Sequence, residues 1–101
     1  MPTKITFVIN NPADPTAFES AYKSIADNAR QFPKLVRSEA AKVWPKENGS
    51  PTPAYRTLDL YFNSYEEASE AVKAPAAREL FDQLGATGTP FIALFSDIEN
   101  S

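Results

Sequence analysis

Residues 55 to 62 alternate clearly between apolar and polar side chains, and this period of two limits the folds open to the chain. Successive side chains of a β-strand point to opposite faces of the sheet. One face would carry Leu58, Leu60 and Phe62, and the other Tyr55, Thr57, Asp59 and Tyr61. The segment therefore predicts a strand in a sheet with one face covered by other elements and one face left open.

The residues before this segment predict a strand followed by a helix. Lys4–Ile9 is rich in β-branched and aromatic residues, which favour a strand. The helix begins either with Asp14 as the cap and Pro15 at the first helical position, or with a capping box of Thr16 and Glu19. An apolar stripe then recurs at helical spacing, at Phe18, Ala21, Tyr22, Ile25 and Ala29.

The segment Leu35 to Trp44 is open to two interpretations. The helical stripe ends near Phe32-Pro33, because proline cannot continue a helix. Residues 39–42 suit a helix equally well. The prolines on either side of the segment, and the need of the strand at 55–62 for a neighbour, favour a strand instead. The polar stretch Lys46–Pro53 then predicts a surface loop.

A second helix follows residue 62, with a break inside it. Ser64 and Glu67 can form a capping box, and Pro75 predicts a kink or a division into two pieces. Gly85 is the expected C-terminal cap, and Phe91–Phe95 reads as a last strand that is apolar on both faces. The inward face of this helix would carry Tyr65, Ala68, Val72, Leu80, Phe81 and Leu84.

The order strand, helix, strand, strand, helix, strand predicts one α+β domain over residues 1–101. A split βαβ arrangement accommodates this order, with two helices on one face of a four-stranded antiparallel sheet. In a monomer, about half of the apolar strand Phe91–Phe95 would be exposed on the open face. Large exposed apolar patches usually mark interfaces, so we expect a homodimer that buries sheet against sheet.

Composition excludes several classes of chemistry. The chain has no histidine and no cysteine, which removes the usual ligands of zinc, haem iron and copper. We therefore expect no metal site and no cofactor. A net charge of −3 with scattered lysines and arginines argues against a nucleic-acid partner. Without an apolar stretch of about 20 residues, a signal sequence or cysteines, we expect no membrane partner and a cytoplasmic location.

Residues 53–71, PAYRTLDLYFNSYEEASEA, resemble the third strand and following helix of the EthD family, in which the strand ends in Phe-x-Ser. The break at Lys73–Ala76 and the helix exit at Phe32–Leu35 fit the same pattern. The resemblance implies a ferredoxin-like βαββαβ fold that pairs into a dimeric α/β barrel. Related barrels include cofactor-free monooxygenases, muconolactone isomerases, polyketide cyclases and haem-degrading enzymes.

One feature of the family pattern is missing. Many EthD-like proteins carry a His-x-Pro-Leu segment on the first helix, eight residues before the exit proline. Counting back from Pro33 places Ile25 at the histidine and Asp27 at the proline. Any chemistry that depends on that histidine, including haem ligation, is therefore not implied for this chain.

Three residues are candidates for catalysis. Asp59 lies mid-strand between two leucines, where desolvation would raise its pKa and suit it to act as a general base. Tyr22 and Tyr61 are the candidate hydrogen-bond donors. The alternative is structural: Asp59 forms an ion pair with Arg37 or Arg56, and the tyrosines belong to the core or the interface.

Three further residues are candidates for ligand binding. Tyr55 is expected to share the open face with Asp59, and Arg37 could orient an anionic group together with Glu39. Trp44 could form the wall of a pocket for an aromatic ligand. The competing interpretations are interface packing for Tyr55, a strand edge protected by charge for Arg37, and a strand anchor for Trp44.

Three functions remain open from the sequence. The first is a small homodimeric barrel that binds a hydrophobic or aromatic metabolite without transforming it, as an accessory to a catabolic or biosynthetic pathway. The alternative is a cofactor-independent isomerase, cyclase or monooxygenase that uses a carboxylate base and a tyrosine donor. The third is an interaction module whose sheet face recruits another protein, for which no internal cavity is expected.

Overall fold

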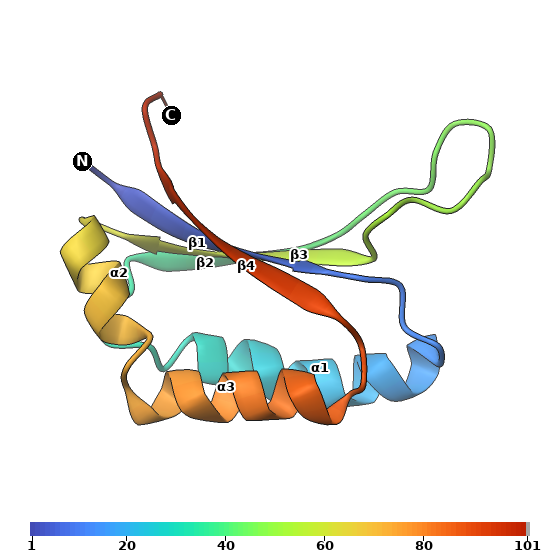
Figure 1. Cartoon of the computed structure of the whole chain (residues 1–101), viewed down its shortest axis with the longest axis horizontal. Coiled ribbons are helices and arrows are strands. Elements are labelled where there is room, and N and C mark those ends of the chain that lie inside the picture. Colours follow the sequence, from blue (N-terminus) through green and yellow to red (C-terminus); the bar gives the residue numbers. More distant parts are fainter. Residues whose placement is uncertain (101) are drawn as a thin grey trace.

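The computed structural model describes residues 1–100, which form a four-stranded antiparallel sheet with three helices on one side (Figure 1). The elements are β1 (Thr3–Ile9), α1 (Pro15–Ala29), β2 (Arg37–Lys42), β3 (Arg56–Phe62), α2 (Tyr65–Ala71), α3 (Pro75–Ala86) and β4 (Phe91–Asp97). The strand order is β2-β3-β1-β4, so β2 and β4 lie at the edges. The predicted α+β fold and its order of elements are confirmed.

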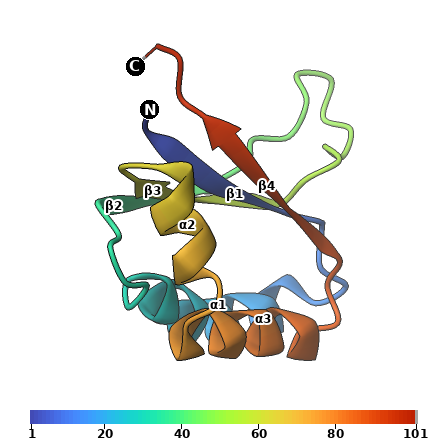
Figure 2. The same ribbon diagram turned by 60° about the vertical axis from the view of Figure 1, so that its left-hand side comes forward.

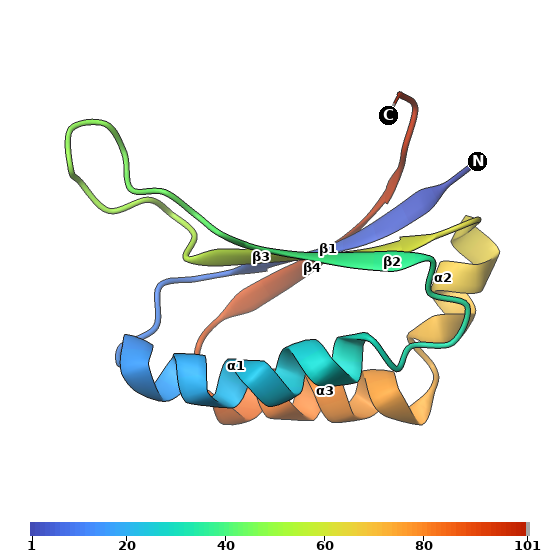
Figure 3. The ribbon, with the colours of Figure 1, turned by 180° about the vertical axis from the view of Figure 1, so that it is seen from behind.

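The hydrophobic core lies between the sheet and the helices. Figure 2 shows α1 and α3 side by side beneath the sheet. Seen from behind, α1 lies in front with β2, whereas α3 lies on the side of β4 (Figures 1 and 3). Every second residue of β1 and β3 faces these helices, and burial of each such side chain contributes about 1.5–3 kcal/mol. The sheet's share of this core is Ile5, Phe7, Ile9, Leu58, Leu60 and Phe62.

The first of the two expected starts of α1 is confirmed. Asp14 is the N-cap, its carboxylate accepts the Ala17 N–H at 3.2 Å, and Pro15 is the first helical residue. The predicted stripe is buried except at Ala21, which is exposed. Ala21 was expected to face the core, but it lies on the flank of α1 that lines a groove beside α3.

The second predicted helix is divided at the proline, as expected. Ser64 caps α2 by accepting the Glu67 N–H at 3.2 Å, and Pro75 opens α3. The expectation that Tyr65 faces inward is wrong, because this side chain is 55% exposed. Tyr65 is the first residue of α2, and its ring packs against Phe95 of β4 at 5.7 Å between centroids.

The uncertain segment 35–44 is a strand in its central residues. Arg37–Lys42 pairs antiparallel with β3, and Glu39 lies opposite Asp59. β4 pairs with β1 and runs two residues beyond the predicted end, to Asp97. The loop predicted from residue 46 to 53 is also confirmed, since none of these residues lies in a helix or strand.

The C-terminal end of α3 lies beyond the expected cap. Gly85 is inside the helix, Thr87 is the C-cap residue, and Gly88 has a φ of +70°. The Thr87 hydroxyl donates to the Leu84 carbonyl at 2.6 Å, which satisfies one of the last helical carbonyls. Only Gly88 therefore needs the conformational freedom of glycine at this terminus.

Alanine substitutions at these two glycines should act in opposite directions. Gly85→Ala should raise the free energy of unfolding by up to about 1 kcal/mol, because a helical glycine is less favourable than alanine. Nothing lies within 4 Å of the added Cβ. Gly88→Ala should lower the free energy of unfolding by about 1–2 kcal/mol, the penalty for a left-handed residue with a Cβ. Urea denaturation of both variants measures the difference, and equal effects would contradict this helix end.

Candidate functional site

The sheet face opposite the helices is called here the open face (Figure 3). Strand register places several of the predicted site residues on it. Strand register places twelve side chains on it in three rows. The half over β2 and β3 is mainly polar, whereas the half over β1 and β4 holds three apolar and three polar side chains. The polar half holds Arg37, Glu39, Ala41, Thr57, Asp59 and Tyr61, and the other half Lys4, Thr6, Val8, Ile92, Leu94 and Ser96.

Arg37, Glu39 and Tyr61 form one hydrogen-bonded group on this face. The Tyr61 hydroxyl donates to one oxygen of Glu39 at 2.7 Å, and Arg37 Nη1 donates to the other at 2.7 Å. The Arg37 guanidinium lies 3.9 Å from the centroid of the Tyr61 ring. The Arg37 hydrogen bond lowers the pKa of Glu39, and the Glu39 carboxylate raises the pKa of Tyr61. Tyr61 is therefore held as a neutral hydroxyl.

Asp59 lies next to this group on the open face, where strand register pairs it with Glu39 of β2 and Thr6 of β1. Its carboxylate accepts the Thr6 hydroxyl, and the Lys4 ammonium lies 3.9 Å away. Strand register also places Asp59 directly opposite Glu39. The two carboxylates are balanced by the charges of Lys4 and Arg37. The four ionisable side chains other than Tyr61 thus form a cluster of zero net charge.

The structure separates Tyr55 from Asp59, contrary to expectation. β3 begins at Arg56, so the alternation of the strand does not extend to Tyr55. The Tyr55 ring instead packs edge-on against Phe18 of α1 at 5.7 Å, and its hydroxyl donates to Glu19 at 2.9 Å. Tyr55 is therefore part of the helix side of the molecule.

An ion pair that the sequence pattern did not predict joins α1 to β3. Arg56 holds Glu19 with two hydrogen bonds, from Nε at 2.9 Å and from Nη2 at 2.7 Å. Arg56 was named as an alternative partner of Asp59, but it shares the helix-facing side with Leu58 and cannot reach the open face. The sequence does indicate this side, because Arg56 lies two residues before Leu58 and alternate residues of a strand share a face.

Tyr22 lies under this ion pair on α1. The Arg56 guanidinium is 4.5 Å from the centroid of its ring, and Phe18 stacks on the ring at 5.7 Å. The Tyr22 hydroxyl is buried, and no residue in the described range 1–100 hydrogen-bonds to it. Burial raises the pKa of Tyr22, so the hydroxyl is protonated. Tyr22 and Asp59 lie on opposite sides of the sheet and cannot share one substrate.

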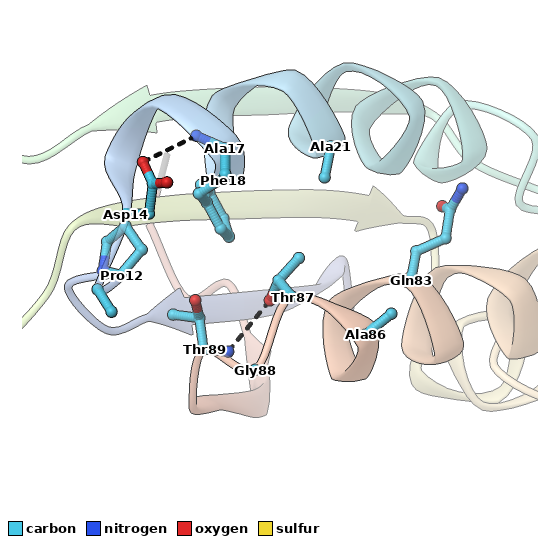
Figure 4. A pocket seen from close by; sticks show the side chains of 11 residues that line it. Pro12, Asp14, Ala17, Phe18, Ala21, Gln83, Ala86, Thr87, Gly88 and Thr89 are labelled. Carbon is cyan, nitrogen blue, oxygen red and sulfur yellow. Dashed lines mark hydrogen bonds between the residues drawn. The ribbon is translucent and has the colours of Figure 1, made fainter.

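An apolar groove of about 350 Å³ opens between the start of α1 and the end of α3. Figure 4 shows Phe18 at its centre, with Ala17 and Ala21 on one wall and Ala86 and Thr87 on the other. Asp14 is the only ionisable residue in its lining, and that carboxylate is engaged as the helix cap. The groove could bind an apolar ligand by shape and contact, but its lining has few groups that could react with one.

A second hollow of about 530 Å³ lies at one end of the sheet, beside the open face. Lys4, Arg37 and Tyr61 line it together with Val36 and Ile98. Trp44 lines none of these hollows, and its side chain is 86% exposed. The structure therefore brings Arg37, Asp59 and Tyr61 together and leaves Trp44, Tyr22 and Tyr55 elsewhere.

Two further features of residues 1–100 bear on function. None of their helices combines the length and the apolar character that a membrane span requires. Nor do these residues bring together three or more carboxylate, histidine or cysteine side chains in a group that could hold a metal ion.

Replacing Glu19 by glutamine tests the ion pair with Arg56. The Arg56 hydrogen bonds lower the pKa of Glu19 from 4.5 to about 2. A carboxylate with a lowered pKa stabilises the fold above its unfolded-state pKa, and the contribution is lost as the pH falls through the folded-state value. Glu19→Gln should therefore lower the free energy of unfolding near neutral pH, and the difference should shrink between about pH 4.5 and pH 2.

Urea denaturation over this pH range measures the effect. The control is Glu79→Gln, which changes an exposed glutamate of α3 that forms no ion pair within residues 1–100. A difference between wild type and Glu19→Gln that does not change with pH would contradict a stabilising charge at Glu19.

Comparison with known proteins identifies one curated relative and many structural ones. No family profile matches the chain. An uncharacterised 11.0 kDa protein from the thcB-thcC intergenic region of Rhodococcus erythropolis is 38% identical over 73 residues, which are 71% of this chain and 70% of that protein.

Solved structures agree on the fold. An EthD family protein from Bacillus halodurans superposes with a TM-score of 0.86 at 16% identity, over 97% of this chain and 99% of that one. SnoaB, a cofactor-independent oxygenase from Streptomyces nogalater, gives 0.74 at 12% identity in its N63A mutant, over 99% and 95%. A dimeric protein of unknown function and ferredoxin-like fold from Bacteroides fragilis gives 0.71 at 8% identity, over 96% of each chain. The chain thus belongs to the family of the Rhodococcus 11.0 kDa protein and has the ferredoxin-like fold of EthD proteins.

Proposed function

We propose that this protein is a homodimer that binds a hydrophobic or aromatic metabolite in the groove between α1 and α3 without transforming it. Such a protein would serve as an accessory to a catabolic or biosynthetic pathway. The observation that carries the proposal is the groove itself, which is apolar, open to ligand and poor in reactive groups. Its volume of about 350 Å³ lies within the usual range of about 300–1,000 Å³ for small-molecule sites.

The polar groups around the groove are already paired within the protein. The Asp14 carboxylate accepts the Ala17 N–H, and the Gln83 carbonyl accepts the Asn28 amide at 2.6 Å. The Thr87 hydroxyl donates to Leu84 and accepts the Thr89 N–H. A ligand in the groove would therefore gain mainly from burying apolar surface against Phe18 and the alanines.

The catalytic alternative has weaker support. Asp59 and Tyr61 do share the open face, and one structural neighbour is a cofactor-independent oxygenase. However, the Tyr61 hydroxyl is committed to Glu39, and the Asp59 carboxylate accepts from Thr6. Tyr61 would have to leave Glu39 before it could donate to a substrate, whereas Asp59 keeps one oxygen, Oδ2, without a hydrogen bond among residues 1–100. Catalysis by Asp59, Tyr22 or Tyr61 stays a prediction, and the groove favours binding over recruitment of another protein.

The open face supports the dimer. Ile92 and Leu94 on this face are 57% and 48% exposed, and Val8 lies between them and the polar half. Ion pairs can be buried when each charge has a partner, and the cluster around Asp59 has zero net charge. A second copy of the same face is thus a suitable cover, and one structural neighbour is described as dimeric.

A charge at Leu94, on the open face, should dissociate the dimer. Leu94→Asp would place an unpaired carboxylate in a buried interface, so we expect the mass in solution to fall from twice 11.1 kDa to 11.1 kDa. Light scattering after size-exclusion chromatography measures the mass. Ser24→Asp, on the exposed surface of α1, is the control and should remain dimeric. A dimeric Leu94→Asp variant would contradict sheet-to-sheet pairing.

Filling the groove should abolish binding. Ala21→Leu adds volume at an exposed helical position, so the fold should be retained while the affinity for a neutral aromatic probe, naphthalene, falls at least about tenfold. NMR titration of the labelled protein measures the affinity and the location, and the Thr87 and Gly88 amides should shift. The matched control is Ser20→Leu, which lies on the other flank of α1. Equal affinities for the two variants would exclude the groove.

A further inference from the structure

The loop between β2 and β3 extends past the ends of both strands as an arm, defined here as residues 43–55 (Figure 1). Asn48 and Gly49 lie at the turn of this arm, and both residues are exposed. We propose that Asn48 deamidates without an enzyme, by attack of the Gly49 backbone nitrogen on its side-chain amide, and that Ser50 assists the attack. This modification is independent of the groove and of the dimer.

The first argument is the accessibility of the attacking nitrogen. The Gly49 N–H donates to the Lys46 carbonyl at 2.8 Å, and this bond must open before the nitrogen can react. The turn is exposed, so water can replace that bond. Gly49 has a φ of +80°, and nothing lies within 4 Å of the position that a Cβ would take. No side chain therefore obstructs the approach of the Gly49 nitrogen to its neighbour.

The second argument is the position of Ser50 beside the amide of Asn48. The Asn48 Oδ1 oxygen accepts the Ser50 N–H at 3.0 Å and the Ser50 hydroxyl at 2.6 Å. Attack on the amide carbon places negative charge on this same oxygen. Hydrogen-bond donors aimed at an oxygen where charge develops lower the barrier of such a step. The turn therefore holds the amide in place and activates it.

The reaction needs only water and hydroxide from the solvent. Hydroxide removes the proton of the Gly49 N–H, and the nitrogen forms a bond to Cγ of Asn48. The bond from Cγ to the amide nitrogen breaks, and that nitrogen takes a proton from water and leaves as ammonia. Water then opens the resulting five-membered imide at either carbonyl, which gives aspartate or its β-linked isomer. The product gains about one mass unit and one negative charge, on a chain whose net charge is −3.

The remaining asparagines are less suited to this reaction. None of them precedes glycine, so the next residue has a Cβ that hinders attack or, in proline, no N–H; they are Asn10, Asn11, Asn28, Asn63 and Asn100. Asn28 lies in α1, where the helix fixes the backbone, and its amide donates to Gln83 at 2.6 Å. The Asn11 amide donates to the Thr52 carbonyl at 2.7 Å, and Pro12 follows it. Deamidation should therefore be concentrated at Asn48.

The test is to incubate the folded protein in a mildly alkaline buffer and to digest samples with trypsin at intervals. Cleavage after Lys46 and Arg56 releases residues 47–56, in which Asn48 is the only amide side chain. Mass spectrometry should show a gain of about one mass unit in this peptide before any other. The gain should be faster at higher pH, because hydroxide removes the proton of the attacking nitrogen.

Ser50→Ala tests the assistance by the hydroxyl. The rate should fall at least about threefold, which is less than the loss of about 10²-fold at a buried oxyanion site, because water competes at this exposed turn. Ser20→Ala, at an exposed position of α1, is the matched control and should keep the wild-type rate. In urea, where the turn is unfolded, wild type and Ser50→Ala should deamidate at the same rate.

Three outcomes would overturn the proposal. If the peptide of residues 47–56 gained mass no faster than the peptides that carry Asn28 or Asn63, Asn48 would not be a preferred site. Equal rates for folded wild type and folded Ser50→Ala would remove the role of the hydroxyl. A difference between these two proteins that persisted in urea would mean that the folded geometry of the turn is not its cause.

Discussion

The sheet has helices on one face only, and most other features of the molecule depend on that asymmetry. α1 and α3 bury the apolar residues of β1 and β3, which leaves the opposite face to solvent or to a partner. The helices lie side by side but differ in length and offset, so their ends do not close over the same area (Figure 2). The groove between α1 and α3 and the open face both follow from this incomplete cover.

The alternation of β3 decides which chemistry is available on each side. Asp59 and Arg56 are three residues apart in one strand. Because side chains alternate along a strand, an odd separation places them on opposite faces. Asp59 therefore finds Thr6 and Lys4, whereas Arg56 finds Glu19 on a helix. The same separation prevents a single active site from using both Asp59 and Tyr22. A binding role needs no such convergence, which is why the geometry favours it.

The sequence was sufficient to predict the fold, because period-two strands, helix caps and prolines are local signals. Asp14, Ser64 and Pro75 each act within one helical turn. Ser64 and Pro75 were assigned correctly, and Asp14 was one of the two starts that the sequence left open. Two of the predictions that failed concern the end of an element: Tyr55 lies just outside its strand, and Tyr65 is the first residue of its helix. There the direction of the side chain depends on a neighbour distant in sequence, Phe18 or Phe95. The Glu19–Arg56 pair was missed for the same reason, since its partners are 37 residues apart.

The two flanks of α1 show how a small protein can offer two kinds of binding surface from one helix. Toward α3 the helix presents alanines and Phe18, and toward β3 it presents Glu19, Tyr22 and Lys23. The stacked rings of Phe18 and Tyr22 lie between the two flanks. Apolar burial would dominate on the first side, whereas charge dominates the second. Raising the ionic strength should thus leave naphthalene in the groove little changed, because salt screens charges and the groove binds by apolar contact.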